Sequence, residues 1–313
     1  MRVLVTGGAG FIGSHTVEAL LAAGHKVTVL DNLSTGNDKN LPPQVPLIEA
    51  DIRYDDITAI FAGVKPEVVI HLAAQTMVPY SQQHPDEDAA TNIVGLTKVL
   101  EACRQTGVRR VVFSSSAAVY GDASALPLQE TDSGAIESFY GLSKMTSEKY
   151  LALYQHCFGM EYVVLRYANV YGERQGDSGE GGVVSIFSRK AAAGEPLVVF
   201  GDGGQTRDFI YVKDIAKANA LAVSTDSPND CYNISTGRET SVNRLIEAFA
   251  QALTPRVMPS VSYQAERKGD IYRSMLNCGK AAEKLGFHAQ TLLEDGVQRT
   301  LNYFLQATSG GNA

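Results

Sequence analysis

Residues 3–15 read VLVTGGAGFIGSH, and this stretch decides the fold of the chain. Its apolar start is typical of a buried β-strand, and helical spacing follows at once over residues 11–23. Three glycines join the strand to the helix as G-x-x-G-x-x-G: Gly7, Gly10 and Gly13. Glycine allows a tight turn with close backbone approach, and a helix N-terminus offers free N–H groups to an anion such as a pyrophosphate. The stretch therefore predicts a strand, turn and helix that bind a dinucleotide.

Outward from this stretch, the first two thirds of the chain alternate β-branched runs with amphipathic segments, as in a parallel sheet covered on both faces by helices. We expect an α/β fold, a Rossmann-like doubly wound parallel sheet, with a smaller mixed α/β domain. The strands expected after the first are 26–30, 47–50, 68–71, 111–114 and 162–166. The helices expected after the first are 87–104, 137–156, 241–251, 279–285 and 292–305, the last three in a part with few buried-strand signals.

The domain boundaries follow from the same pattern. Residues 208–235 read as strand, helix and strand, and the last strand is expected to return to the first sheet. We therefore assign 1–169 with about 209–235 to the dinucleotide-binding domain, and about 170–208 with 236–313 to the second domain. A Gly-rich loop is expected at 172–182 and a frayed tail at 308–313.

Composition limits the possible functions. The 313 residues carry 27 Lys plus Arg against 34 Asp plus Glu, and the net charge of -7 has the wrong sign for gripping nucleic acid. The sequence shows neither a bilayer-spanning tract nor a secretion signal. The cysteines lie far apart without metal-ligand spacing: Cys103, Cys157, Cys231 and Cys278. We expect a cytoplasmic protein with reduced thiols and with no metal, membrane or nucleic-acid partner.

Asp31 follows the second expected strand. It is placed to accept hydrogen bonds from the two hydroxyls of an adenosine ribose, and no Arg follows it to bind a 2′-phosphate. NAD is therefore expected rather than NADP. The alternative is that Asp31 only caps a turn, but its position after the strand favours the cofactor role.

Tyr140 and Lys144 form Y-x-x-x-K near a helix start, one turn apart on one face. Alone, the pair also fits an ordinary solvated helix. A cation about 4 Å from a phenol contributes at most about 4 kcal/mol at an effective dielectric of about 20, or a pKa change of about 3. That predicts a phenolate base near neutral pH. Residues 114–116 are three serines at the carboxyl edge of the sheet; they are compatible with a polar turn, but the edge favours a site role.

Six segments now carry a family resemblance. They are TGGAGFIGSH at 6–15, VLDNLSTG at 29–36, HLAA at 71–74, FSSSAAVYG at 113–121, YGLSK at 140–144 and LRYANVYG at 165–172. Nearly the whole chain resembles an extended short-chain dehydrogenase/reductase, specifically the nucleotide-sugar epimerases of the UDP-galactose 4-epimerase type.

The resemblance implies roles for individual residues. Tyr140 would be the base, Lys144 would hold the nicotinamide ribose and lower the Tyr140 pKa, and Ser116 would hydrogen-bond the sugar 4-hydroxyl. The residues implied at the NAD site are Gly7, Gly10, Phe11, Ile12, Gly13, Asp31, Asn32, Leu33, Ser34, Thr35, Gly36, Asp51, Ile52, Leu72, Ala73, Ala74, Gln75, Asn92, Ser114, Tyr140, Lys144 and Tyr167.

The implied reaction shuttles a hydride. Hydride passes from sugar C4 to NAD as Tyr140 takes the 4-hydroxyl proton, and the 4-keto sugar then turns and receives hydride on its other face. Related dehydratases carry an Asp-Glu pair, and related decarboxylases a Glu, where this chain has Ala117 and Ala118. Their absence favours simple epimerisation.

The second domain would bind the nucleotide sugar. Arg207 and Arg267 match the arginines that grip the diphosphate in such enzymes, unless they form surface ion pairs with Asp208 and Glu266. Phe200 falls where the uracil packs, a position also compatible with a core strand. The substrate residues implied are Ser116, Tyr140, Asn169, Val184, Val198, Val199, Phe200, Arg207, Arg267, Asp270 and Ser274.

Ser274 bears on the choice of sugar. In the family this position stands over the sugar C2 substituent, and a Tyr there excludes N-acetyl sugars. Ser leaves room for an acetamido group unless local packing fills the space. We expect UDP-glucose and UDP-galactose as substrates, together with UDP-GlcNAc and UDP-GalNAc.

Residues 87–104 and 137–156 resemble the helices that pair across the dimer in this superfamily, although much of their apolar stripe must face the parent sheet. A homodimer through a four-helix bundle is expected. Two other functions stay open: a 4-epimerase of UDP-glucuronate or another nucleotide sugar, and a non-catalytic NAD-binding regulatory protein on the same fold. Intact Ser116, Tyr140 and Lys144 favour an enzyme.

Overall fold

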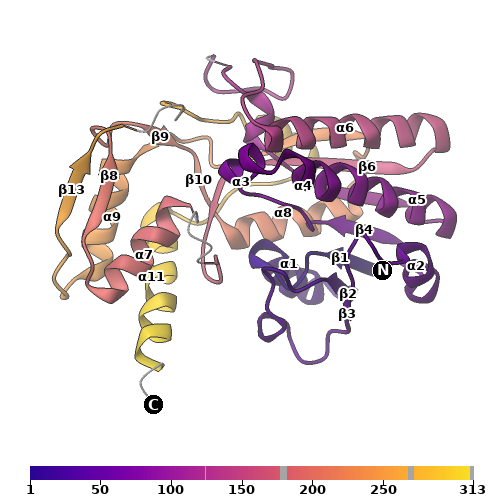
Figure 1. Ribbon diagram of the computed structural model, residues 1–313, viewed down its shortest axis with the longest axis horizontal. Coiled ribbons are helices and arrows are strands. Elements are labelled where there is room, and N and C mark those ends of the chain that lie inside the picture. The colour runs from indigo at the N-terminus through magenta and orange to yellow at the C-terminus, as the bar shows by residue number, and fades with distance from the viewer. Residues whose placement is uncertain (124, 177–181, 267–270, 311–313) are drawn as a thin grey trace.

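A computed structural model of the chain describes residues 1–123, 125–176, 182–266 and 271–310 (Figure 1). Its centre is a seven-stranded parallel sheet, which confirms the expected fold class. The strands in spatial order are β11 (Asp230–Ile234), β6 (Glu161–Tyr167), β5 (Arg110–Ser116), β4 (Val68–His71), β1 (Arg2–Thr6), β2 (Lys26–Asp31) and β3 (Leu47–Glu49).

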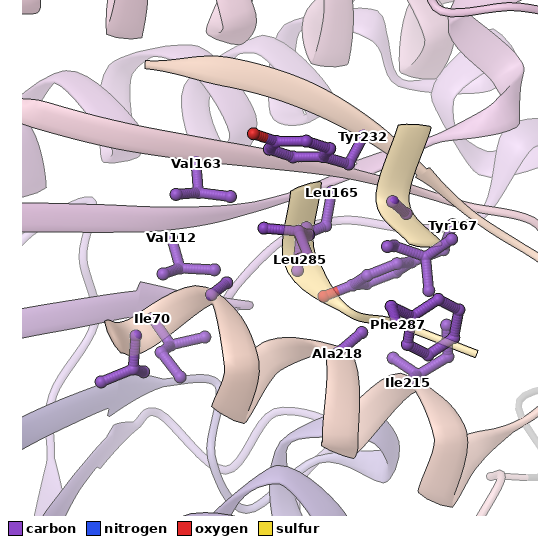
Figure 2. Close-up of a cluster of buried hydrophobic side chains, with 14 of the residues drawn as sticks. Ile70, Val112, Val163, Leu165, Tyr167, Ile215, Ala218, Tyr232, Leu285 and Phe287 are labelled. Atoms are coloured by element: carbon purple, nitrogen blue, oxygen red, sulfur yellow. The ribbon is translucent and has the colours of Figure 1, made fainter. Parts of the chain in front are cut away.

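Each face of this sheet is apolar because successive side chains point to opposite sides. Val3 and Val5 of β1 join one hydrophobic core, whereas Leu4 joins the other. Helices α1 (Phe11–Ala22) and α8 (Val212–Ser224) cover the first face, and Figure 2 shows Ile215 and Ala218 of α8 beneath the strands. Helices α2 (Ile57–Val64), α5 (Leu96–Thr106) and α6 (Phe139–Phe158) cover the second face.

The chain crosses from one edge of the sheet to its middle at one point. After β3 it passes through α2 and returns as β4 on the other side of β1. The connection after β1 leads to one side of the sheet and the connection after β4 leads to the other, so a crevice is left above the carboxyl ends of these two strands. Open α/β sheets bind their ligands in such a crevice.

The expected helix over 87–104 contains an irregularity. It consists of α4 (Pro85–Ala89), a π-helical turn (Ala90–Gly95) and α5. A shorter helix, α3 (Val78–Gln83), precedes it. The described residues also contain two 3₁₀ turns in the connections of the large sheet. Asp38–Asn40 lies between β2 and β3, and Ala117–Tyr120 lies between β5 and α6.

The second part of the molecule packs around its own core. Its helices are α7 (Val183–Ala193), α9 (Val242–Leu253) and α11 (Leu293–Gly310), while α10 (Gly279–Leu285) packs on the core of the large sheet. Three two-stranded sheets accompany them: β7 (Asn169–Tyr171) with β10 (Phe209–Tyr211), β9 (Thr206–Arg207) with β12 (Thr240–Ser241), and β8 (Leu197–Phe200) with β13 (Val261–Gln264).

Two details of this part add to the sequence-based expectations. Strand β13 lies after residue 241, where few buried-strand signals were expected, and it has no apolar run because most of its side chains are exposed. Helix α11 continues to Gly310, so the tail expected to fray at 308–313 begins as helix, and residues 311–313 lie outside the described ranges. Strand β11 lies beside β6, so the chain returns to the large sheet after visiting the second part. None of the helices in the described ranges has both the length and the apolar character of a bilayer span.

Candidate active site

The turn between β1 and α1 is shaped for close approach by a ligand. Gly7 has a φ of +70°, and a Cβ on it would lie 2.6 Å from the backbone nitrogen of Ala73. A Cβ on Gly13 would lie 2.0 Å from the carbonyl oxygen of Gly7. Helix α1 begins at Phe11, after Gly10, with no side-chain cap. No side chain therefore occupies its first N–H groups, and this arrangement is compatible with the predicted anion site.

One cavity of about 1260 Å³ extends from this turn past the ends of β4 and β5 to β8 and β9. Its volume exceeds the roughly 300–1,000 Å³ of a typical single-ligand pocket, so it has room for two nucleotide-sized ligands. The predicted residues that line it are Gly7, Gly10, Phe11, Ile12, Gly13, Asp31, Asn32, Ser34, Thr35, Asp51, Ile52, Leu72, Ala73, Ala74, Gln75, Ser114, Ser116, Tyr140, Lys144, Tyr167, Asn169, Val184, Val198, Val199, Phe200 and Arg207.

A few predicted residues do not line the cavity. Leu33 and Gly36 lie next to the Asp31 carboxylate, to which the Leu33 N–H donates at 2.9 Å. Asn92 is buried behind Gln75, and Ser274 is half-buried away from the cavity lining. Two more predicted substrate residues lie outside the described residues: Arg267 and Asp270.

Asp31 serves both the turn and the cavity. Its buried carboxylate accepts the N–H groups of Ala9 and Leu33, each at 2.9 Å, which ties the Gly-rich turn to the end of β2. The same side chain lines the cavity. The capping role and the proposed ribose contact are therefore compatible, because a carboxylate has about four lone-pair sites.

Arg53 is a cavity residue that sequence reasoning missed. It forms an ion pair with Asp51 at 2.8 Å, and this hydrogen-bonded partner lowers the pKa of Asp51 to about 2. Asn32 donates to the same carboxylate at 2.8 Å. An Arg two residues after an Asp that follows β3 was the available signal. The other cavity residues missed include Arg174, Gln175, Phe187, Gln205, Phe209 and Gln264.

The three serines belong to β5 itself rather than to a polar turn. The Ser114 hydroxyl donates to the His71 carbonyl at 3.1 Å, and the Ser115 hydroxyl donates to Glu148 at 2.5 Å. The Ser116 hydroxyl accepts the Ala118 N–H at 3.2 Å, and the same side chain opposes the rise that burial causes in the Tyr140 pKa. Of the three serines, Ser116 is therefore the one that acts on the phenol.

Tyr140 and Lys144 lie on the buried face of α6. Ser138 is the N-cap of this helix, and its hydroxyl accepts the N–H of Gly141. The Lys144 ammonium donates to the Ser114 carbonyl at 2.8 Å and lies 5.9 Å from the centre of the Tyr140 ring. The solvated-helix alternative is therefore wrong for both residues. Together with Ser116 they form one polar group at the carboxyl end of β5.

The expectation that Lys144 alone makes Tyr140 a phenolate near neutral pH is wrong. Burial raises the pKa of Tyr140 to about 12 and lowers the pKa of Lys144 to about 8. Burial, the largest cause of both changes, disfavours the charged form of each group, and the ammonium is bound to the Ser114 carbonyl. A further positive charge next to Tyr140 would favour proton removal.

Arg207 and Phe200 lie at the far end of the cavity. The Asp208 carboxylate is buried and accepts the N–H groups of Thr236 at 2.9 Å and Gly237 at 3.1 Å, so it faces away from the cavity that Arg207 lines. A surface ion pair between Arg207 and Asp208 is therefore wrong. Phe200 ends β8, is half-buried and lines the cavity, so it belongs to a strand while facing the site, and its contact with uracil stays a prediction.

Fold and site together define a class of protein, and residues 3–235 match the model of the NAD dependent epimerase/dehydratase family. The chain belongs to this family, and NAD is its cofactor. The residues present fit that cofactor: a side chain at Gly7 or Gly13 would collide with backbone, no side chain caps the first N–H groups of α1, and Asp31 lines the cavity at the end of β2.

The relatives narrow the class. The chain is 44% identical to a putative UDP-glucose 4-epimerase of Methanocaldococcus jannaschii, over 96% of this chain and 97% of that protein. It matches the crystal structure of UDP-glucose 4-epimerase from Thermotoga maritima with UDP-glucose at a TM-score of 0.93 and 42% identity, covering 98% and 100% of the two chains. A second solved structure is UDP-N-acetylglucosamine 4-epimerase from Methanobrevibacter ruminantium in complex with UDP-N-acetylmuramic acid. It matches this chain at a TM-score of 0.92 and 37% sequence identity, and the match covers 98% of each of the two chains. The chain is an isomerase of the UDP-glucose 4-epimerase type.

Proposed function

We propose that this enzyme interconverts UDP-glucose and UDP-galactose at C4 and also accepts the N-acetyl pair UDP-GlcNAc and UDP-GalNAc. The observation that carries the proposal is the presence of Ser116, Tyr140 and Lys144 in the same cavity as both the Gly-rich turn and Arg207. The relatives bind UDP-sugars, which supports a UDP-sugar partner for this chain.

The proposed mechanism assigns one task to each residue. Tyr140 takes the proton of the sugar 4-hydroxyl, while Ser116, which lines the same cavity, orients that hydroxyl. NAD, when bound, would supply the hydride acceptor and donor for C4 and a positive charge at the nicotinamide end of the site. Lys144 adds its own charge and holds the cofactor ribose.

The residues around the reacting carbon favour epimerisation over elimination. Ala117 and Ala118 begin the 3₁₀ turn next to Ser116 and present no carboxylate. A 4-keto sugar that meets no additional acid or base there is reduced again rather than dehydrated or decarboxylated. The grip on the diphosphate by Arg207, the uracil contact of Phe200 and the sugar contact of Asn169 complete the proposal; the roles of Arg267 and Asp270 stay predictions.

The test combines cofactor content with a substrate screen. Mass spectrometry of the purified protein is expected to find bound NAD, and the enzyme is expected to convert both the hexose and the N-acetylhexosamine pairs but not UDP-glucuronate. Tyr140→Phe is expected to keep its NAD and lose about 10²–10⁴-fold in kcat, the usual contribution of acid–base catalysis. Full activity of this variant would rule out Tyr140 as the base.

We further propose a homodimer through α5 and α6. Leu142, Leu153 and Phe158 on α6 are each about half exposed, as is Val94 beside α5. Large apolar side chains gathered on one helical pair are typical of an interface. Light scattering at micromolar concentration is expected to give twice the mass of one chain, and Leu153→Lys to reduce it to one. The interleaved domain division and the cytoplasmic location stay predictions.

A further inference from the structure

A buried carboxylate stands behind the cavity wall without a role in the mechanism above. Asp88 on α4 is 1% exposed. Its Oδ1 accepts the Gln75 side-chain amide at 2.9 Å and the Asn92 side-chain amide at 3.1 Å. None of the ion pairs within the described ranges involves it. Because burying a carboxylate without an ion-pair partner costs several kcal/mol, this arrangement points to a function.

The hydrogen bonds of Asp88 lead to both sides of the site. The Asn92 side chain accepts the Gln75 N–H at 2.9 Å and donates to the Gln75 carbonyl at 3.0 Å, which fixes the backbone of the cavity wall. It also donates to the Ser143 hydroxyl at 3.1 Å, next to Lys144. The π-helical turn Ala90–Gly95 contains Asn92, which is buried, and such turns occur often at functional sites.

The charges around Lys144 single out Asp88. Within the described residues, His71 from β4, Asp88 from α4 and Glu148 from α6 interact electrostatically with Lys144, and Tyr167 from β6 interacts with Tyr140. Burial lowers the pKa of His71 to about 3, so it is neutral. Glu148 is ion-paired with Arg166 at 2.6 Å. Asp88 is thus the negative charge near Lys144 that no cation offsets within the described residues.

We propose that Asp88 is a positioning residue of the epimerase: through Asn92 it fixes the cavity wall at Gln75, and it is the counter-charge that keeps Lys144 an ammonium ion. The inference rests on the proposed function, because it assigns Lys144 its charge during the reaction.

The sign of the electrostatic effect is the same for both catalytic groups. Burial lowers the pKa of Lys144 to about 8, and the negative charge of Asp88 opposes that change. The same charge raises the pKa of Tyr140. Without it, Lys144 loses its proton at lower pH and Tyr140 does so too. The acid and alkaline limbs of the kcat profile therefore both move to lower pH, whereas damage to packing alone lowers kcat without moving either limb.

The experiment compares Asp88→Asn, Asp88→Glu and Asp86→Asn in the NAD-loaded enzyme. Asp86 is the matched control, since it lies on the same helix and is exposed. Asp88→Asn is expected to shift both limbs down by about one pH unit, tenfold in each proton equilibrium. Asp88→Glu is expected to keep the limbs at their wild-type pH, and Asp86→Asn to match wild type throughout. A lower kcat with unmoved limbs in Asp88→Asn, or unchanged kinetics, would overturn the proposal.

Two further measurements keep the test decisive. NMR titration of the Lys144 side-chain nitrogen, in protein labelled at lysine, is expected to give a lower pKa in Asp88→Asn than in Asp86→Asn; equal values would contradict the counter-charge. If Asp88→Asn does not fold, Gln75→Leu removes one donor to the same carboxylate and is expected to move the limbs in the same direction by less. If the wild-type enzyme epimerises none of the UDP-sugars, the proposed function fails, yet the titration still reports whether Asp88 acts on Lys144.

Discussion

The two ends of the cavity are built in different ways. At the end that we propose holds NAD and the catalytic residues, called the NAD end below, Asp31 and Ser116 are the last residues of strands in the seven-stranded sheet, and each has further partners that hold it in place. At the end that we propose holds the diphosphate and the uracil, called the substrate end below, Phe200 and Arg207 come from strands of four and two residues in separate small sheets. The last residue of a long strand is positioned by the many ladder hydrogen bonds along that strand. A short strand has few such bonds, so its position depends on contacts with residues that are distant in the sequence.

The substrate end shows this dependence in its hydrogen bonds. The Thr206 N–H donates to the Tyr272 carbonyl at 2.8 Å, and the Thr206 hydroxyl donates to Glu239 at 2.6 Å. Glu239 also accepts the Arg273 Nε at 2.8 Å. Arg207 is thus presented by a strand that two distant segments hold. We expect changes at the NAD end to affect cofactor and fold, and changes at the substrate end to affect KM and sugar choice.

The largest effect in this comparison is expected for Gly13→Ala at the NAD end. The new Cβ would lie 2.0 Å from the Gly7 carbonyl oxygen, where backbone must move. We expect a loss of about 3 kcal/mol in the free energy of unfolding, and at least a hundredfold weaker NAD binding. Denaturant titration and calorimetry measure the two. Gly63→Ala is the matched control, because nothing lies within 4 Å of its Cβ; a similar loss there would show that the turn is not special.

An intermediate effect is expected for Arg207→Ala at the substrate end. A charge-assisted hydrogen bond to a phosphate contributes about 1.5–3 kcal/mol, so KM is expected to rise about 10- to 100-fold while NAD content is unchanged. Steady-state kinetics and cofactor analysis measure both quantities. Arg238→Ala, an exposed arginine outside the cavity lining, is expected to leave KM as it is. If Arg207→Ala lowered the NAD content, the claim that the substrate end acts on KM alone and not on cofactor binding would be contradicted.

The smallest and most selective effect is expected for Ser274→Tyr. If this position stands over the C2 substituent, the variant loses about tenfold or more of its N-acetylhexosamine activity and keeps its hexose activity, because a close steric conflict of about 1.4 kcal/mol is tenfold in rate. Ser274→Ala is expected to keep both. Ser274 does not line the cavity, so equal activities of Ser274→Tyr on the two pairs would show that sugar choice is made elsewhere.

Much of the NAD end could be predicted from the sequence, because apolar runs mark buried strands and the residue after a parallel strand has one possible edge to occupy. Gly7, Asp31 and Ser116 were located in this way, and the cavity brings them together. Residues that act by burial were not predictable. Asp86 and Asp88 are indistinguishable as acids in the first turn of a helix, yet one is exposed and the other buried.

Other features escaped for related reasons. Helical spacing placed Tyr140 and Lys144 on one face, but it did not show how deeply both are buried or that the Ser114 carbonyl binds the Lys144 ammonium. Burial raises the pKa of Tyr140 and lowers the pKa of Lys144, which the helical spacing alone could not predict. Strand β13 lacked an apolar run because most of its side chains face solvent.

The central claim is that the hydride removed from C4 returns to C4 within one cavity. UDP-glucose labelled with deuterium at C4, converted by the enzyme in ordinary water, tests this directly. NMR of the UDP-galactose formed is expected to find the deuterium retained at C4, because the hydride never exchanges with solvent. Loss of the label to water at C4 would contradict the mechanism, even if the enzyme makes UDP-galactose.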